Sequence, residues 1–259
     1  MDNRVDVVIG TVIYRQGSYI IDKFLANQKE IQQEYPSSEL LLATNEPDYV
    51  EELARFIKLG GVKGRVIPYE TVKPSYARSK VWNIASGREM IRQYMLSQTG
   101  AKYLLSLDVD MIYAPDIISI MEREIKGCDV LFSGAPLREL RNAIGMGIGC
   151  AMLTRDVLEK VAFRCIEFRD GDVIDDGCTL ELDLIRLGRR IRKGIFLSIA
   201  HYMNENEVRH INPQPLGLFR SITTSRFIRC VLLRGSVLLR RDIATRLRLI
   251  VYRFIGLTR

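Results

Sequence analysis

Two carboxylates separated by one residue, Asp108 and Asp110, have a type and spacing that could do chemistry. They follow residues 103–107, a mostly apolar run that predicts a buried strand. At the C-terminal end of a parallel strand, such a pair can bind a hard divalent cation through oxygen. A cation there can bind a diphosphate and neutralise it as it departs. Asp-x-Asp is expected about once by chance in a chain of this length, and it can simply cap a turn, so its position in the fold must support the interpretation.

The elements that precede this pair predict a parallel α/β sheet covered by helices on both faces. Residues 5–11, 40–44 and 66–67 read as strands. Helices begin near Ser18 and Pro47, and a long helix is expected over about 79–97. Ligands of such sheets bind at the carboxyl ends of the strands. Thr11, Asn45 and Asp108 all fall at that edge, which supports a binding site there.

The second half of the chain supplies further candidate residues. Residues 145–154 form an apolar strand with alternating glycines, including Gly147 and Gly149, and such glycines allow a ligand or another backbone to approach closely. Asp175 and Asp176 precede a helix over about 178–187, where either could cap the helix. We expect a last strand at 194–200 that ends at His201.

Composition narrows the classes of protein. The chain has 259 residues, 47% of them apolar, which suffices for one large α/β domain or for one domain plus an appendage. Its five cysteines are odd in number and show no Cys-x-x-Cys spacing, which favours a reducing compartment and argues against a zinc site. Residues 1–6 do not resemble a signal peptide, and no uncharged run reaches the length of a membrane span. We therefore expect a cytoplasmic protein.

The order of these motifs resembles that of GT-A nucleotide-sugar glycosyltransferases, close to glycosyltransferase family 2, over roughly residues 4–203. The motifs that carry the resemblance are a first strand and turn at Val7–Arg15, Asn45-Glu46 after the second strand, Arg78-Ser79-Lys80 with Asn83, Asp108-Val109-Asp110, the strand from Gly147 to Arg155, and Asp175-Asp176 ahead of Arg186-Leu187-Gly188. The resemblance implies an α/β GT-A (Rossmann-like) domain over residues 1–216. It also implies transfer of a sugar from a UDP- or GDP-type donor to an acceptor hydroxyl, with inversion.

The resemblance also implies roles for individual residues. Asp110 would bind Mn²⁺ or Mg²⁺, Asp108 the ribose or the metal, and His201 would add a nitrogen ligand. Asp176, or else Asp175, would be the general base that takes the acceptor proton. The remaining candidates would bind substrate, with the two glycines on the strand that meets the acceptor: Thr11, Tyr14, Arg15, Asn45, Glu46, Arg78, Lys80, Asn83, Gly147 and Gly149.

The net charge of +7 is concentrated at the C-terminal end. Residues 217–259 carry ten Arg and one acid, Asp242, whereas residues 1–216 are nearly neutral. Helical periodicity over about 223–241 separates an apolar face from an Arg face, which predicts an amphipathic segment on the inner face of an anionic membrane. A lipid-linked acceptor is then expected. The segment could instead dock on the domain, join a homo-oligomer or bind nucleic acid, and a nucleotidyltransferase of similar fold is an alternative enzyme.

Overall fold

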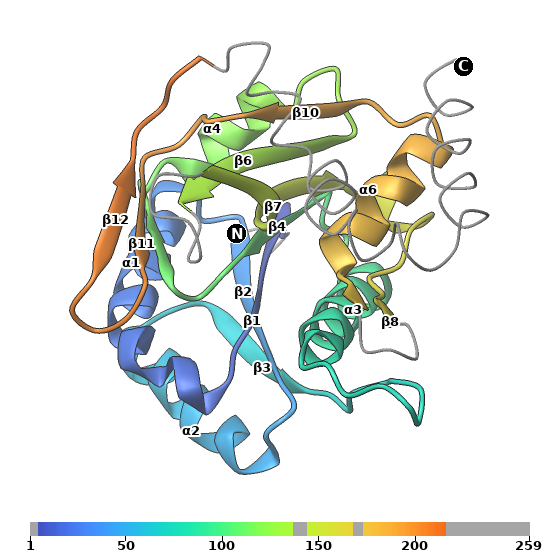
Figure 1. Cartoon of the computed structure of the whole chain (residues 1–259). Helices are drawn as coiled ribbons and strands as arrows, with labels where there is room; N and C mark the ends of the chain where they lie inside the picture. The colour runs from blue at the N-terminus through green and yellow to red at the C-terminus, as the bar shows by residue number, and fades with distance from the viewer. Residues whose placement is uncertain (1–4, 137–143, 168–172, 216–259) are drawn as a thin grey trace.

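The structure, a computed structural model, describes residues 5–136, 144–167 and 173–215 of the chain. A seven-stranded sheet forms its centre, with strand order β10-β6-β7-β4-β1-β2-β3 (Figure 1). Its strands are β1 (Val7–Val12), β2 (Ser38–Thr44), β3 (Gly64–Pro68), β4 (Tyr103–Leu107), β6 (Val130–Pro136), β7 (Ile144–Thr154) and β10 (Ile191–Gly194).

Helices flank the sheet, and short strands complete its edges. Figure 1 shows α1 and α2 on one side and α3 and α6 on the other. The helices are η1 (a 3-10 helix, Arg15–Ile20), α1 (Ile21–Glu34), α2 (Pro47–Gly60), α3 (Val81–Gln98), α4 (Ile117–Glu124), α5 (Arg155–Leu158) and α6 (Asp176–Arg186). The strands of the two small sheets are β5 (Met111–Tyr113), β11 (Ile199–Tyr202) and β12 (Val208–Ile211), and β8 (Ile166–Glu167) with β9 (Val173–Ile174).

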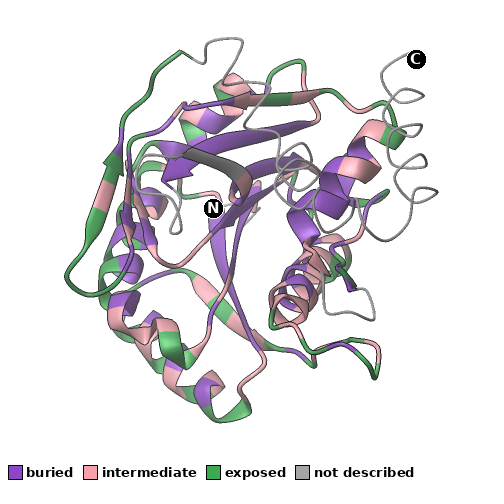
Figure 2. Cartoon of the chain, viewed as in Figure 1, coloured by how far each residue is buried: buried purple, intermediate pink, exposed green. Residues whose placement is uncertain are grey.

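The mostly parallel sheet predicted from the sequence is confirmed. Strands β4, β1, β2 and β3 pair in parallel, and so do β10 and β6. Strand β7 is antiparallel to both of its neighbours, β4 and β6. Every residue of β2 is buried, as expected for a strand with helices on both faces. Figure 2 shows this buried centre beneath more exposed helices.

The prediction of one last strand at residues 194–200 is wrong. Strand β10 ends at Gly194 as the last strand of the large sheet, and the next strand, β11, belongs to a different sheet, where it pairs with β5 and β12. Ile195, Leu197 and Ile199 are all buried along the crossing, so the apolar run continues although the strand does not. His201 consequently lies inside β11, where it pairs with Met111 just after the Asp-x-Asp motif.

Close packing of α3 against β1 fixes the helix that later supplies a site residue. Gly10 of β1 has no side chain, and a Cβ there would lie 2.6 Å from Cγ2 of Ile91 on α3. Ile91 is buried in the main core together with Leu104 of β4. The glycine therefore sets how closely α3 can approach the sheet.

The amphipathic C-terminal segment predicted from the sequence, residues 217–259, falls outside the described residues. Among the residues that are described, no helix is both long and apolar enough to cross a bilayer.

We expect Gly10→Ala to lower the free energy of unfolding by about 1–3 kcal/mol, because the added methyl group overpacks the contact with Ile91. Gly100→Ala is the matched control: a Cβ there meets nothing within 4 Å, and the change should stay within about 0.5 kcal/mol. Urea denaturation of both variants measures the difference. Equal midpoints would contradict the close contact.

Candidate functional site

Asp108 and Asp110 lie between β4 and β5, at the carboxyl edge of the parallel strands. The backbone N–H of Asp108 donates to the carbonyl oxygen of Gly149 on β7 at 2.9 Å. A Cβ on Gly149 would lie 2.0 Å from Oδ2 of Asp108, so the carboxylate occupies the space that a side chain would fill. Gly149 is thus required by the position of Asp108. Gly147 lies two residues away on the same strand and is half-buried.

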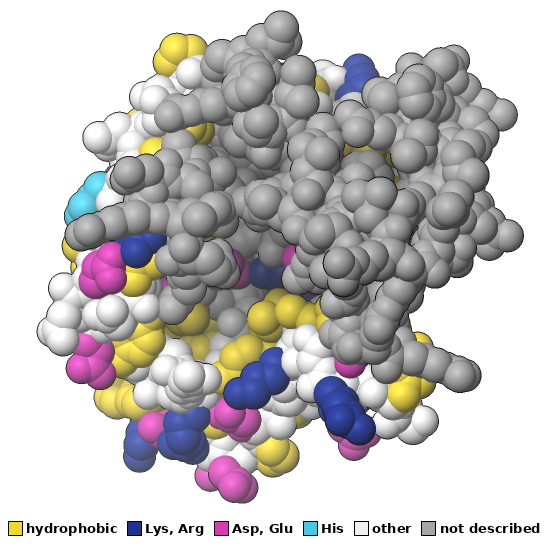
Figure 3. All heavy atoms as spheres, viewed as in Figure 1, with side chains coloured by type: hydrophobic (Ala, Val, Ile, Leu, Met, Phe, Trp, Pro, Cys, Tyr) yellow, Lys and Arg dark blue, Asp and Glu magenta, His cyan; other side chains and the backbone are white. Residues whose placement is uncertain are grey.

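Arg88 of α3 joins two carboxylates at the centre of the site. Its Nη2 donates to Oδ1 of Asp108 at 2.8 Å, and its Nη1 donates to Oδ2 of Asp176 at 2.8 Å. Burial lowers the pKa of the Arg88 guanidinium, but Asp176 and Asp108 outweigh it and raise that pKa above its ordinary value. The guanidinium therefore stays charged and holds the two carboxylates in place. Figure 3 shows acidic and basic side chains together on the floor of the central hollow.

Arg88 was not among the site residues predicted from the sequence. Its position on the helix could have indicated it, because Arg88 lies on the same buried face of α3 as Ile91 and Met95. An Arg within a buried stripe needs a charge partner, since burying an unpaired charge is costly. The identity of that partner, 88 residues away in Asp176, is not a local property of the sequence.

Asp175 and Asp176 occupy different environments at the start of α6. Asp175 is the N-cap residue, and its Oδ1 accepts a hydrogen bond from the backbone N–H of Cys178 at 2.9 Å. Asp176 is buried and directed at Arg88. The structure therefore brings Asp176 to the proposed metal motif and gives the capping function to Asp175.

His201 and Asp110 face each other beside this cluster. Nε2 of His201 lies 3.4 Å from Oδ2 of Asp110. Nδ1 of His201 lies 2.7 Å from the carbonyl oxygen of Pro136. Because a carbonyl oxygen only accepts hydrogen bonds, Nδ1 carries a proton, and the lone pair of neutral His201 is on Nε2. Nε2 is buried and has no hydrogen-bond partner among the described residues.

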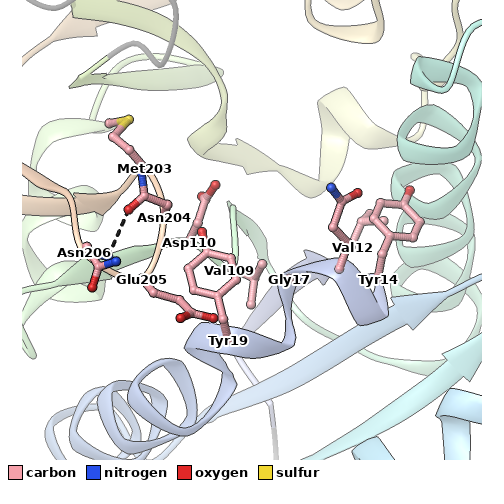
Figure 4. Close-up of a pocket in the computed structure, with 11 residues that line it drawn as sticks. Val12, Tyr14, Gly17, Tyr19, Val109, Asp110, Met203, Asn204, Glu205 and Asn206 are labelled. Carbon is pink, nitrogen blue, oxygen red and sulfur yellow. Dashed lines mark hydrogen bonds between the residues drawn. The ribbon is translucent and has the colours of Figure 1, made fainter.

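A pocket of about 780 Å³ opens above Asp110, a size typical of small-molecule sites. Figure 4 shows its walls: η1 and the end of β1 on one side, and the turn between β11 and β12 on the other. Tyr202 donates its N–H to the carbonyl oxygen of Asp110 at 2.8 Å, and the Tyr19 hydroxyl donates to the carbonyl oxygen of Tyr202 at 3.2 Å. The residues that line the pocket are Val12, Tyr14, Gln16, Gly17, Tyr19, Val109, Asp110, Met203, Asn204, Glu205 and Asn206.

Three predicted donor-binding residues meet at one end of the site. Tyr14 and Tyr69 share a hydrogen bond of 3.0 Å between their hydroxyls, and Tyr69 donates to the carbonyl oxygen of Asn83 at 2.8 Å. Nδ2 of Asn45 donates to Oγ1 of Thr71, which donates to Oδ1 of Asn83. Burial raises the pKa of Tyr14 to about 12, so its hydroxyl stays protonated at neutral pH. Tyr69 and Thr71 were not identified from the sequence, because neither belongs to a recognisable motif.

Two other residues predicted to bind the donor, Arg15 and Glu46, contact each other and α2. Nη1 of Arg15 donates to Glu52 of α2 at 2.6 Å, and its guanidinium lies over the Tyr49 ring. Glu46 accepts the Arg15 backbone N–H at 2.7 Å.

Thr11 is buried inside β1, whereas the side chains of Arg78 and Lys80 are exposed and do not line the pocket. Their roles in donor binding stay predictions.

The described residues supply two protein ligands for a metal rather than a closed cage. Within residues 5–136, 144–167 and 173–215, no group of three or more His, Cys, Asp or Glu side chains is placed to hold a metal ion. If a metal were held by Asp110 and His201 alone, its other coordination positions would fall to ligand oxygens and water, as in Mg²⁺ and Mn²⁺ sites on phosphate substrates.

Comparison with known proteins supports the fold. No protein-family model and no curated protein sequence matches the chain. The mannosyltransferase PcManGT from Pyrobaculum calidifontis, solved in complex with GDP-Man and Mn2+, is similar in structure with a TM-score of 0.53 and 14% identity. That match covers 75% of this chain and 56% of the mannosyltransferase. TarS from S. aureus in complex with UDP has a TM-score of 0.49 and 11% identity, with 93% of this chain and 77% of TarS covered. The chain has a GT-A type fold, as its motif order predicted.

We expect Arg88→Met to lower the free energy of unfolding by about 3–5 kcal/mol, because it leaves the buried Asp176 carboxylate without its partner. Adding Asp176→Asn to this variant should recover most of the loss, since no buried charge is then unpaired. Urea denaturation of the single and double variants measures the coupling.

Arg123→Met provides the control, because Arg123 pairs with Glu124 at an exposed position and should cost about 1 kcal/mol or less. Equal losses for Arg88→Met and Arg123→Met would show that the central ion pairs contribute little.

Proposed function

We propose that the protein is a metal-dependent glycosyltransferase that moves a sugar from a nucleoside diphosphate sugar to an acceptor hydroxyl. The observation that carries this proposal is the approach of His201 Nε2 to Oδ2 of Asp110 at 3.4 Å, since Asp110 lines the pocket. With Nδ1 of His201 bound to Pro136, two electron-rich atoms face each other there. An imidazole nitrogen and a carboxylate oxygen are both ligands that Mn²⁺ accepts.

Charge in the pocket supports the same proposal. The residues that line it include two carboxylates, Asp110 and Glu205, and no Lys or Arg among those described. A divalent metal bound beside these carboxylates would attract a diphosphate. When bound, Mn²⁺ or Mg²⁺ at Asp110 and His201 would neutralise the leaving diphosphate. A nucleotidyltransferase handles a triphosphate with Lys and Arg side chains, so this lining disfavours the alternative enzyme.

Asp176 is the proposed general base. The acceptor hydroxyl oxygen attacks the anomeric carbon, the bond from that carbon to the diphosphate oxygen breaks, and the hydroxyl proton passes to the Asp176 carboxylate. Arg88 orients this carboxylate, since its Nη1 donates to Oδ2 of Asp176. Attack from the face opposite the leaving group gives inversion at the anomeric carbon. Asp108 lies next to this pair and is proposed to bind the ribose or the metal.

The donor base is proposed to lie at the end of the site formed by Tyr14, Asn45 and Asn83. Their hydrogen-bonded amides and hydroxyls offer both donors and acceptors for a base edge, which suits a UDP- or GDP-type donor.

The acceptor is proposed to be membrane-proximal or lipid-linked. The support is the charge of residues 217–259, whose ten Arg and single acid would suit the inner face of an anionic membrane. The enzyme would then work in the cytoplasm as a peripheral membrane protein, with residues 1–216 as the GT-A domain. Homo-oligomerisation through the same segment is a second candidate arrangement.

Metal-dependent donor binding tests the function. We expect one nucleotide sugar of a UDP and GDP panel to raise the melting temperature with Mn²⁺ and much less with EDTA. His201→Gln should abolish the metal-dependent part of the shift. His210→Gln is the matched control, because His210 is exposed on β12 and should leave the shift unchanged. A full shift in EDTA, or in the His201 variant, would rule out the metal assignment.

The assignment of the base is tested by exchanging each Asp of the pair for Asn. We expect Asp176→Asn to lower the turnover number by about 10²-fold or more while donor binding persists. Asp175→Asn should leave turnover close to wild type, because Asn caps a helix as well as Asp does. Turnover with the cognate donor measures both variants. If only the Asp175 variant is inactive, the two roles are reversed.

A further inference from the structure

The loop between β3 and α3 differs in character from the rest of the described surface. Residues 71–80, here called the cationic loop, contain Lys73, Arg78 and Lys80 and no acidic residue. The loop also carries two large exposed apolar side chains, Val72 at 77% and Tyr76 at 52% exposure. Figures 1 and 2 show this segment projecting from the molecule below α3. Single exposed apolar residues are ordinary, but two of them among three cations form an amphipathic projection.

Hydrogen bonds hold the cationic loop in this projecting shape. The backbone N–H of Val72 donates to Oγ of Ser86 on α3 at 3.0 Å. The backbone N–H groups of Arg78 and Ser79 donate to the two carboxylate oxygens of Glu167 at 2.8 and 3.2 Å.

The same carboxylate also accepts the indole N–H of Trp82 at 2.9 Å. The Arg78 N–H is the largest influence that lowers the pKa of Glu167, so this carboxylate is ionised at neutral pH. Hydrogen bonds thus anchor the loop at both ends, and the side chains of Val72 and Tyr76 are exposed to solvent between these anchors.

The cationic loop is connected directly to the candidate site. Thr71, its first residue, bonds to Asn45 and Asn83 at the proposed donor-base end. Its last residue precedes α3, which carries Arg88. A surface bound by this loop would therefore lie beside the site.

We propose that the cationic loop docks on an anionic lipid surface, with Val72 and Tyr76 entering the interface and Lys73, Arg78 and Lys80 meeting the lipid phosphates. This proposal rests on the membrane-proximal acceptor proposed above and names a contact surface within the GT-A domain itself. Charge complementarity selects the occupant, because the three exposed cations of the loop outnumber the two adjacent carboxylates, Glu70 and the buried Glu167, and leave a net positive charge that attracts anionic headgroups. An aromatic ring and a branched aliphatic chain beside them are the anchors that interfacial segments use.

Leu59 provides a control for the general effect of an exposed apolar residue on membrane binding. Leu59 at the end of α2 is also 77% exposed. Helix α2, however, carries three acidic and two basic residues, so Leu59 lacks the cationic surroundings of Val72. Leu59→Asp is thus the control for the double variant Val72→Asp/Tyr76→Asp.

Flotation of the full-length protein with vesicles of phosphatidylcholine containing phosphatidylglycerol tests the proposal. We expect the double variant to partition onto these vesicles on the order of tenfold more weakly than wild type, whereas Leu59→Asp should stay within about twofold. Lys73→Gln should weaken binding severalfold and reduce its dependence on salt. Equal melting temperatures of the variants show that they are folded, and Val72→Ser/Tyr76→Ser replaces the Asp variant if it is not.

Unchanged partitioning of the double variant, or equal losses in the double variant and Leu59→Asp, would overturn the proposal. Wild type that ignores anionic vesicles and binds duplex DNA would overturn it too. The donor-induced melting shift is measured on the same samples. If that shift is absent while the variants still differ on vesicles, the proposed glycosyltransferase function fails and the docking surface stands.

Discussion

One buried guanidinium sets the geometry of the candidate site. Arg88 comes from α3 and binds carboxylates from the end of β4 and the start of α6. A charge in this position is stable only if its partners stay in place, because unpaired buried charge costs several kcal/mol. The approach of α3 to the sheet, set by Gly10, and the space left by Gly149 are therefore both conditions for this contact. The stability of the fold and the geometry of the site therefore both depend on the side chains of Arg88, Asp108 and Asp176.

The site handles charge in two different ways. On the side of α6, Arg88 compensates Asp108 and Asp176 permanently. On the side of the pocket, Oδ2 of Asp110 lies 3.4 Å from Nε2 of His201, whose Nδ1 contacts the carbonyl oxygen of Pro136. This is the half of the site where a divalent cation is proposed to bind. The described lining of the pocket includes the carboxylates of Asp110 and Glu205, which are the kind of oxygen ligand that Mn²⁺ and Mg²⁺ prefer.

Glu167 anchors the C-terminal end of the cationic loop. Its carboxylate accepts three hydrogen bonds, two from backbone N–H groups of the loop and one from Trp82 at the start of α3. The N-terminal end of α3 then joins three features: the proposed donor-base end, the central ion pairs and the projecting apolar residues. A membrane contact at this end would place the site close to an acceptor that is itself embedded in lipid.

The sequence by itself determined the succession of strands and helices in the first half, the carboxyl edge and the Asp-x-Asp motif at that edge, because apolar runs and turn residues are local signals. It also gave the motif order from which the GT-A fold was predicted. Only the tertiary structure separated Asp175, a helix cap, from Asp176, a partner of Arg88, since both residues precede the same helix. It alone fixed the proton on Nδ1 of His201, through a carbonyl oxygen 65 residues away. Periodicity reports which face of an element is buried, whereas a buried charge depends on partners that other elements bring to it, and no local pattern specifies them.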